Sequence, residues 1–213
     1  MNKEVLNLKI IILGNSGVGK TALINRYTKN KFVPQANVTI GSDFLCKLLT
    51  VNDQLLNLQI WDTFGQEKHN ALSGAYYRNA DCCILVCDLN DKSSSDMLDQ
   101  WYATLIGSTC EKSAGPIPIV VVGNKIDVDL KKRRVTMDHI MKSFDDNTPC
   151  YETSAKDSIN VDELFFTVAK KALEQHRNDE AFSSSTIDNL IKIMETDEKL
   201  FSQKGKNKSN CTC

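Results

Sequence analysis

The chain has 213 residues, of which 41% are hydrophobic and 25% charged, a composition typical of one soluble globular domain with a real core. Its formal net charge of −1 gives no indication of nucleic-acid binding, and no nucleic-acid partner is expected. No apolar run reaches the roughly 18 residues of a membrane span, and the first residues lack a signal-peptide pattern. We therefore expect a cytosolic protein whose eight cysteines form no disulfide framework.

Apolar runs and helical patterns alternate along the chain as far as residue 176. Apolar runs predict strands at 8–13, 43–50, 54–61, 82–87, 118–122 and 150–153. Apolar residues at helical spacing predict helices near 20–27, 93–107, 136–144 and 160–176. The turn pair Asn52-Asp53 makes a hairpin of the second and third strands. We expect a three-layer α/β fold, with helices on both faces of a six-stranded, mostly parallel sheet that has one antiparallel strand.

The residues after the first strand fit the pattern of a phosphate-binding P-loop. Phosphate contacts are expected from Asn15, Ser16, Gly17, Val18, Gly19, Lys20 and Thr21, which follow Gly14. Glycines let backbone N–H groups turn toward one anion, and the helix start adds unpaired donors and the positive end of its dipole. Lys20 is expected along the β- and γ-phosphates, and the Thr21 hydroxyl on a Mg²⁺ ion. The alternative is a chance glycine turn between strand and helix.

Four more stretches fall on the same expected edge, beyond the carboxyl ends of the strands, where such sheets bind ligands. They are Val38-Thr39-Ile40-Gly41, Asp62-Thr63-Phe64-Gly65-Gln66-Glu67, Gly123-Asn124-Lys125-Ile126-Asp127 and Glu152-Thr153-Ser154-Ala155-Lys156. No single motif is decisive. In this order and spacing, however, the five motifs closely resemble those of the Ras-like small GTPases over residues 7–176.

The particular residues found in several motifs narrow the resemblance to one family within this group. Gly41-Ser42-Asp43-Phe44 and Trp61-Asp62-Thr63 are similar to the Rab family. The runs at 81–86, 152–156 and 159–161 are similar to its late-endosomal and lysosomal branch. The resemblance implies a P-loop small GTPase fold at residues 1–176, a switch that binds GTP or GDP with Mg²⁺, hydrolyses GTP, and regulates vesicle traffic to late endosomes, lysosomes or phagosomes. It implies an exchange factor, an activating protein and effectors as partners.

The resemblance assigns the guanine base to two of the motifs. Asn124 and Asp127 would select guanine, because a carboxylate accepts the N1 and exocyclic amine protons that adenine does not offer together. This pair argues against the alternative of an ATP-using P-loop enzyme. Further base contacts are expected from Phe32 beside the base, Lys125 over it, Ala155 with its N–H on O6, and Ser154 and Lys156 in support of that loop.

Two segments are expected to sense the γ-phosphate. The resemblance places the Thr39 hydroxyl on Mg²⁺, Asp62 near the ion, and the Gly65 N–H on a γ-oxygen, so that losing the phosphate releases both segments. Gln66 is the expected catalytic residue, which orients the attacking water. Because no arginine of this chain is evident for the transition state, hydrolysis is expected to be slow until an activating protein supplies one.

Three positions depart from the family pattern: Phe64 replaces an alanine, His69 an aromatic residue, and Ala36 a tyrosine. The Phe64 ring is expected to block the closed state and slow hydrolysis; the alternative is that it packs outward and joins the effector face. The rival to a cycling switch is therefore a GTP-binding module that recruits effectors and hydrolyses little.

Phe44, Trp61 and Tyr76 resemble the aromatic trio through which Rabs meet effectors, although each alone is more often a core residue. The cysteines within 82–87 are expected to be small buried hydrophobes. The three histidines, His69, His139 and His176, are expected at the surface, without a zinc site.

After residue 176 the composition shifts to polar residues, which predicts a flexible tail at 177–213. Apolar residues within 187–194 have helical spacing, and a short amphipathic helix and disorder both stay open. The ending Cys211-Thr212-Cys213 resembles the Rab prenylation signal, which implies a prenyl transferase with its escort protein and a GDP dissociation inhibitor. Two prenyl chains would anchor the protein to the cytoplasmic face of late endosomal, lysosomal or related vesicle membranes, with a cytosolic pool.

Overall fold

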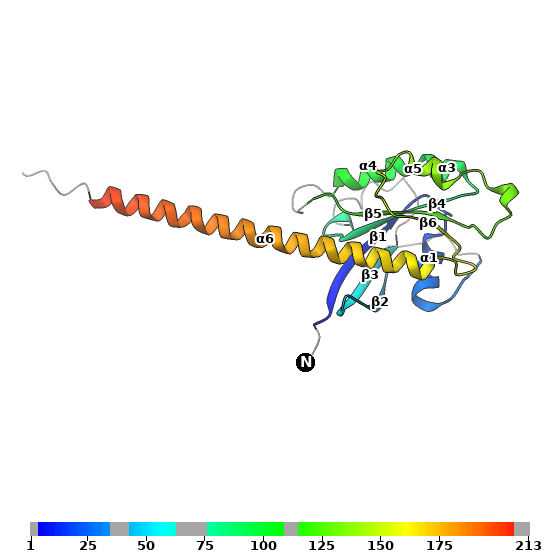
Figure 1. The fold of residues 1–213 in the computed structure, drawn as a ribbon, viewed down its shortest axis with the longest axis horizontal. Helices are drawn as coiled ribbons and strands as arrows, with labels where there is room; N and C mark the ends of the chain where they lie inside the picture. The colour runs from blue at the N-terminus through cyan, green and yellow to red at the C-terminus, as the bar shows by residue number, and fades with distance from the viewer. Residues whose placement is uncertain (1–3, 35–42, 63–75, 109–114, 207–213) are drawn as a thin grey trace, which may run out of the picture.

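The computed structural model describes residues 4–34, 43–62, 76–108 and 115–206, with only the backbone for residue 43 and residues 185–206. A six-stranded sheet lies at its centre, in the order β2-β3-β1-β4-β5-β6 (Figure 1). The strands are β1 (Leu6–Leu13), β2 (Asp43–Val51), β3 (Gln54–Asp62), β4 (Cys82–Asp88), β5 (Ile119–Asn124) and β6 (Cys150–Thr153). Among them only β2 is antiparallel to its neighbour, which confirms the predicted sheet.

Helices cover both faces of the sheet, as predicted (Figure 1). One face carries α1 (Lys20–Lys29) and α6 (Val161–Lys206). The other face carries α3 (Lys92–Asp96), α4 (Leu98–Ser108) and α5 (Met137–Met141), and the short 3₁₀ turn η2 (Leu130–Lys132) follows β5. The chain therefore has the three layers that the sequence predicts.

Alternate side chains of β1 pack into two hydrophobic cores, one on each face of the sheet. Ile10 and Ile12 belong to the core under α1 and α6, whereas Ile11 and Leu13 belong to the core under α4 and α5. All four side chains are fully buried, and each such burial contributes roughly 1.5–3 kcal/mol. The glycine-rich loop that follows Leu13 is thus attached to a strand whose last four residues are buried on both faces of the sheet.

The cysteines of β4 behave as small buried hydrophobes, which confirms that prediction. Cys82, Cys83 and Cys87 are fully buried. Burial raises the pKa of Cys82 and of Cys87 to about 12, and raises that of Cys83 well above its ordinary value. These thiols are protonated near neutral pH and serve as packing groups.

The helix expected at 93–107 is divided into α3 and α4 at Met97. The Asp91 side chain caps α3 by accepting the Ser93 N–H, and the Ser94 and Ser95 hydroxyls donate to backbone carbonyls nearby. Such local side-chain bonds compete with helix continuation, which explains the break. The helix expected at 136–144 is shortened to α5, because the N–H groups of residues 143 and 144 bond three residues back rather than four.

The last helix is much longer than the one expected at 160–176. Its first four turns bury an apolar stripe against the sheet: Val161, Leu164, Phe165, Val168, Ala169, Ala172 and Leu173. Beyond this stripe the helix continues to Lys206 and leaves the body of the molecule (Figure 1). The extension includes residues 187–194, whose backbone is helical. No glycine or proline occurs between residues 161 and 204, so no strong stop signal ends the helix there.

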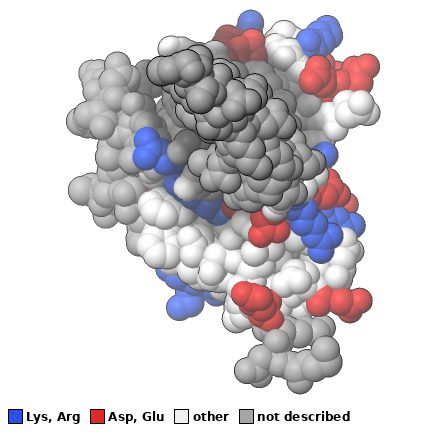
Figure 2. All heavy atoms as spheres, turned by 90° about the vertical axis from the view of Figure 1, so that its left-hand side faces the viewer, with Lys and Arg blue, Asp and Glu red and all other residues white. Residues whose placement is uncertain are grey.

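Charged side chains of both signs are interspersed around the base of this extension, in the view along its axis (Figure 2). Over the described residues, no helix is both long enough and apolar enough to cross a membrane. His139 is exposed and His176 is partly exposed. Within the same described residues no group of three or more His, Cys, Asp or Glu side chains is placed to hold a metal ion, while His69 lies outside them.

Candidate functional site

Two glycines of the loop after β1 are required by close neighbours and by their backbone conformation. Gly14 has φ 144° and Gly19 has φ 103°, values that favour glycine. A Cβ at Gly14 would lie 2.1 Å from the Val86 carbonyl oxygen, and one at Gly19 would lie 2.3 Å from Asn124 Nδ2. The loop therefore packs its backbone directly against the ends of β4 and β5.

Lys20, the first residue of α1, lies inside this loop. Its Nζ donates to the carbonyl oxygens of Gly14 at 2.6 Å and Asn15 at 2.9 Å. The residue is only 5% exposed, and burial lowers its pKa to about 8, against the opposing effect of the Asp62 carboxylate. The structure thus brings a buried amine to the place where the sequence predicts phosphates, and phosphate charge would favour its protonated form.

Two predicted magnesium ligands meet at the start of α1 and the end of β3. Thr21 Oγ1 donates to Asp62 Oδ2 at 2.5 Å. Asp62 is 7% exposed, and both side chains offer oxygen atoms, the ligand type that Mg²⁺ prefers. The donor set therefore fits the ion that the sequence predicts.

Asn124, at the end of β5, connects the glycine-rich loop to the loop after β6. Its Nδ2 donates to the Val18 carbonyl at 2.9 Å. Its Oδ1 accepts from Thr153 Oγ1 at 3.1 Å and from the Ala155 N–H at 3.4 Å. With 1% exposure, this amide is a buried junction of three segments.

Lys125 adds a second connection to the same loop. Its Nζ donates to the Gly17 carbonyl at 2.6 Å and forms an ion pair with Asp88 Oδ2 at 2.8 Å. Asp88 was not among the predicted site residues, although its place at the carboxyl end of β4 was a usable signal. This aspartate helps to hold the lysine stem at the edge of the sheet.

Asp127, the residue predicted to read guanine, is held by the loop after β6. Its Oδ1 accepts from Ser154 Oγ at 2.8 Å, and Ser154 Oγ itself accepts the Asp157 N–H at 2.9 Å. Lys156 Nζ lies 3.8 Å from Asp127 Oδ2, but the lysine side chain is 57% exposed and adds little. The carboxylate is therefore oriented mainly by Ser154.

Two other predicted positions border this region. Phe32 is half-buried and packs on the core under α1 and α6. Asn15 Oδ1 accepts from Trp101 Nε1 of α4 at 2.8 Å, a contact across 86 residues that no local sequence pattern indicates. The described residues of the predicted phosphate and base loops thus lie beside supporting side chains, Trp101 from α4 and Asp88 from β4.

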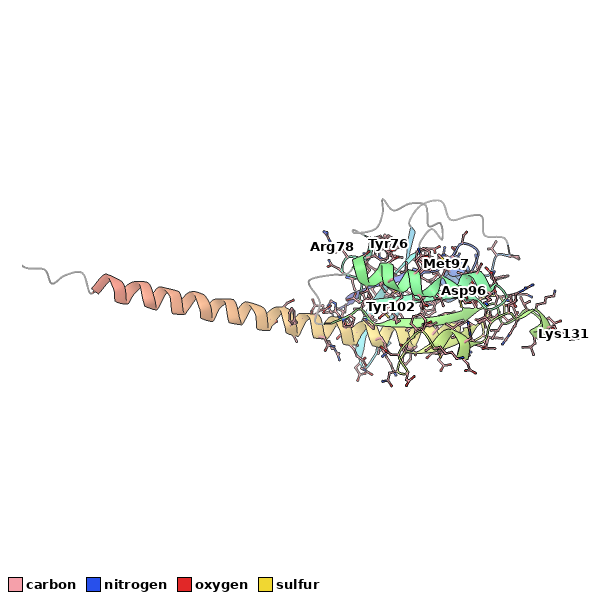
Figure 3. The ribbon with its side chains drawn as sticks, turned by 90° about the horizontal axis from the view of Figure 1, so that it is seen from above. Tyr76, Arg78, Asp96, Met97, Tyr102 and Lys131 are labelled. Carbon is pink, nitrogen blue, oxygen red and sulfur yellow. The ribbon has the colours of Figure 1, made fainter. Side chains whose placement is uncertain are left out.

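The three predicted effector-facing aromatics form one cluster. Phe44 and Trp61, which pair across the β2–β3 hairpin, have ring centroids 5.2 Å apart, and Trp61 meets Tyr76 edge-on at 5.7 Å. Phe44 is 47% exposed, while the other two are partly buried. Figure 3 shows Tyr76 from the side of α4. Contact among the three is thereby observed, and their role toward effectors stays a prediction.

Several predictions fall outside the described residues. They concern Thr39, Gly65 and Gln66 at the γ-phosphate, the departures Ala36, Phe64 and His69, and the prenylation sites Cys211 and Cys213.

Comparisons of the sequence with known proteins give one family match and several relatives. The family model "Ras family" matches residues 9–174. "Ras-related protein Rab7" of Pisum sativum is 46% identical over 184 residues, which cover 85% of this chain and 89% of that protein. "Ras-related protein RABG3a" of Arabidopsis thaliana is 47% identical over 176 residues, covering 81% and 85%. "Ypt/Rab-type GTPase avaA" of Emericella nidulans is 41% identical over 200 residues, covering 93% and 97%.

Proposed function

The chain belongs to the Ras family of small GTPases, as a Rab-type GTP hydrolase that regulates vesicle traffic, and we propose that this traffic leads to late endosomes and lysosomes. The proposal for the compartment is supported by the sequence at residues 81–86, 152–156 and 159–161 and by the similarity to relatives named Rab7. GTP and GDP are the nucleotides that membership of this family implies.

The observation that carries the nucleotide assignment is the buried junction at Asn124. One amide fixes the glycine-rich loop through Val18 and the predicted base loop through Ala155. The amide thereby fixes the proposed phosphate and base loops relative to each other, and such preorganisation favours tight binding.

Each polar group then has a proposed role toward the nucleotide. The Lys20 ammonium pairs with the β- and γ-phosphates, and the Asp127 carboxylate accepts the two guanine donors. Mg²⁺, when bound, neutralises phosphate charge; the Thr21 hydroxyl and the Asp62 carboxylate hold it, with Thr39 as a further proposed ligand.

For hydrolysis we propose that Gln66 orients the attacking water and that the Gly65 N–H holds a γ-oxygen. An activating protein supplies the missing arginine, and an exchange factor resets the switch. Effectors meet the cluster of Phe44, Trp61 and Tyr76. The prenyl transferase with its escort protein modifies Cys211 and Cys213, and the GDP dissociation inhibitor maintains the cytosolic pool.

Single-turnover hydrolysis of bound GTP tests the enzymatic part. Wild type loaded with GTP and Mg²⁺ is expected to release phosphate slowly, and Gln66→Leu is expected to be slower still, with unchanged GTP affinity. ATP in a competition against fluorescent GDP is expected to fail at concentrations where GTP succeeds. Equal competition by ATP would overturn the guanine assignment, and equal rates in the two proteins would overturn the role of Gln66.

The same assay decides between a cycling switch and a module that hydrolyses little. If the Phe64 ring obstructs closure, Phe64→Ala raises the rate by up to ~10²-fold, the loss that a misplacement of about 1 Å can cause. Equal rates at equal nucleotide affinity would instead leave Phe64 as a surface or partner residue.

Membrane fractionation of cells tests the anchor and the compartment. Changing Cys211 and Cys213 together to serine is expected to move the protein entirely to the cytosol. Wild type is expected to fractionate with late endosomal and lysosomal markers. Persistence of the double variant on membranes would place the anchor elsewhere in the chain.

A further inference from the structure

Arg26, in the last turn of α1, donates to two successive carbonyls of the loop after β6. Its Nε lies 2.8 Å from the Ala155 oxygen, and its Nη2 lies 2.8 Å from the Lys156 oxygen. The guanidinium fork presents parallel N–H groups, so it can hold two neighbouring carbonyls in one orientation. Arg26 and Ala155 are 129 residues apart in the sequence, and the side chain is half-buried between their segments.

The third nitrogen of the same side chain holds the end of α1. Arg26 Nη1 lies 3.2 Å from the Asn30 carbonyl oxygen and 3.1 Å from Asn30 Oδ1. Asn30 is the left-handed cap of α1, and its N–H in turn donates to the Arg26 carbonyl. Phe32, predicted to lie beside the base, follows two residues later. One guanidinium therefore ties together the two segments that are predicted to flank the guanine.

The partners of Arg26 are neutral oxygens. No carboxylate among the described residues forms an ion pair with it. A guanidinium that is satisfied by carbonyl dipoles alone orients peptide groups rather than balancing a charge. In a planar trans peptide, a fixed carbonyl also fixes the following N–H on the opposite side.

That peptide geometry links Arg26 to the residue predicted to read guanine. Holding the Lys156 carbonyl fixes the Asp157 N–H, which donates to Ser154 Oγ at 2.9 Å. Ser154 Oγ donates in turn to Asp127 Oδ1 at 2.8 Å. A continuous path thus runs from α1 through the base loop to the Asp127 carboxylate.

We propose that Arg26 is a positioning residue for guanine, which sets the base loop and, through Ser154, the orientation of Asp127. The proposal rests on the proposed nucleotide function and deepens it. Without the guanidinium, the peptides at 155–157 can rotate, and the guanine contacts lose their alignment. The nucleotide would then dissociate faster, while the phosphate contacts in the glycine-rich loop remain.

Release of fluorescent GDP from the full chain in Mg²⁺ measures this role. Arg26→Gln is expected to release GDP about 10-fold to 100-fold faster than wild type, the range set by losing a hydrogen bond to a charged group. Arg26→Lys keeps the charge but not the fork, so it is expected to stay close to Arg26→Gln. Lys29→Gln removes a positive charge from the same helix and is the matched control, expected to match wild type.

A second readout separates positioning from general loosening. The preference for GDP over ADP, measured by competition against fluorescent GDP, is expected to fall by about the same factor as the GDP affinity. A merely structural role would weaken both nucleotides alike and would be restored by Arg26→Lys. Either of those results would overturn the proposal.

Asp127→Ala, measured in parallel, distinguishes a failure of the positioning role of Arg26 from a failure of the guanine assignment. If it weakens GDP while Arg26→Gln changes neither release nor preference, the positioning role is wrong and the guanine site stands. If Asp127→Ala leaves GDP binding unchanged, the guanine assignment fails, and the role of Arg26 fails with it.

Discussion

The two ends of the sheet use polar side chains differently. At the carboxyl ends of the strands, Asn124 and Lys125 bond to the glycine-rich loop, and Asp127 bonds to the loop after β6. At the amino ends, Asp81 accepts the Lys9 N–H at 2.7 Å and meets His176 Nδ1 at 3.1 Å. The first set holds loops at the ends of the strands, whereas the second set joins a helix to the sheet.

Figure 3 shows the two ends in one view, with Lys131 of η2 at the first end and Arg78 at the second. Loops that lie beyond the ends of the strands can change shape without unfolding the sheet, but a helix that loses its attachment exposes core. Substitutions at the carboxyl end should therefore change ligand affinity more than stability. Substitutions at the amino end should do the reverse.

The largest expected effect is that of Asp127→Ala. The variant removes the carboxylate that would accept two guanine donors, and charge-assisted bonds of this kind are worth about 1.5–3 kcal/mol each. We expect GTP affinity to fall by at least 100-fold in a competition titration, with little change in the thermal unfolding midpoint. Unchanged GTP affinity would contradict the guanine assignment.

A smaller loss is expected for Gly19→Ala. The new Cβ would lie 2.3 Å from Asn124 Nδ2, at a φ of 103° that is costly for alanine. The matched control is Gly17→Ala, which has φ 80° but open space around the new Cβ. Strain of this kind costs about 1–3 kcal/mol, so the excess loss of GDP affinity in Gly19→Ala measures the contact with Asn124. Equal losses in the two variants would show that this contact is unimportant.

At the amino end, Asp81→Ala is expected to lower the free energy of unfolding by about 1–3 kcal/mol, because the Lys9 N–H and His176 lose their acceptor. GDP release should not change. Chemical denaturation and a release assay on the same preparation test both statements. A faster release without lost stability would remove the distinction between the two ends.

The contribution of Asp81 to the free energy of unfolding depends on pH, which gives a second test of the same contacts. Burial raises the pKa of Asp81 above its ordinary value of 3.8, although the Lys9 N–H and His176 act to lower it. The folded state thus holds the proton more tightly, so the contribution of this group to stability is greatest at low pH and declines as the pH rises through the raised pKa. Asp81→Asn should lack that decline, and its stability relative to wild type should improve from pH 4 upward.

The smallest effect is expected for His176→Gln. The His176 contact with Glu180 at 3.3 Å involves a carboxylate whose side chain is 68% exposed, and such pairs contribute about 0.3–0.5 kcal/mol. Loss of the Asp81 contact adds to this, but glutamine can still donate to the carboxylate. We expect a destabilisation below about 1 kcal/mol by denaturation; a larger one would mean that His176 fixes more of α6 than these two bonds.

Sequence reasoning predicted the sheet and the edge that carries the site, because apolar runs mark the strands and the motifs directly follow Leu13, Trp61 and Val122. It did not predict the break at Met97, which depends on serine hydroxyls bonding to the backbone. The contacts of Arg26 are with backbone carbonyls far along the chain, so no residue pattern indicates them.

The length of α6 was missed for another reason. The prediction ended the helix where the stripe that packs on the sheet ends, near Leu173. A stretch without glycine or proline lacks the strongest stop signals, so it can continue as a helix after its contacts with the sheet end. The boundary between a GTPase domain at 1–176 and a tail at 177–213 stays a proposal.

Because residues 177–206 are helical, both the length of this segment and the direction in which each side of it faces are fixed relative to the sheet. Thirty helical residues extend about 45 Å at 1.5 Å per residue, whereas thirty residues of flexible coil would span roughly 30 Å with no preferred direction. A straight helix also fixes the rotation of its far end about the helix axis, since each residue adds a turn of about 100°. Whatever holds its far end would thus select which side of the globular body faces outward.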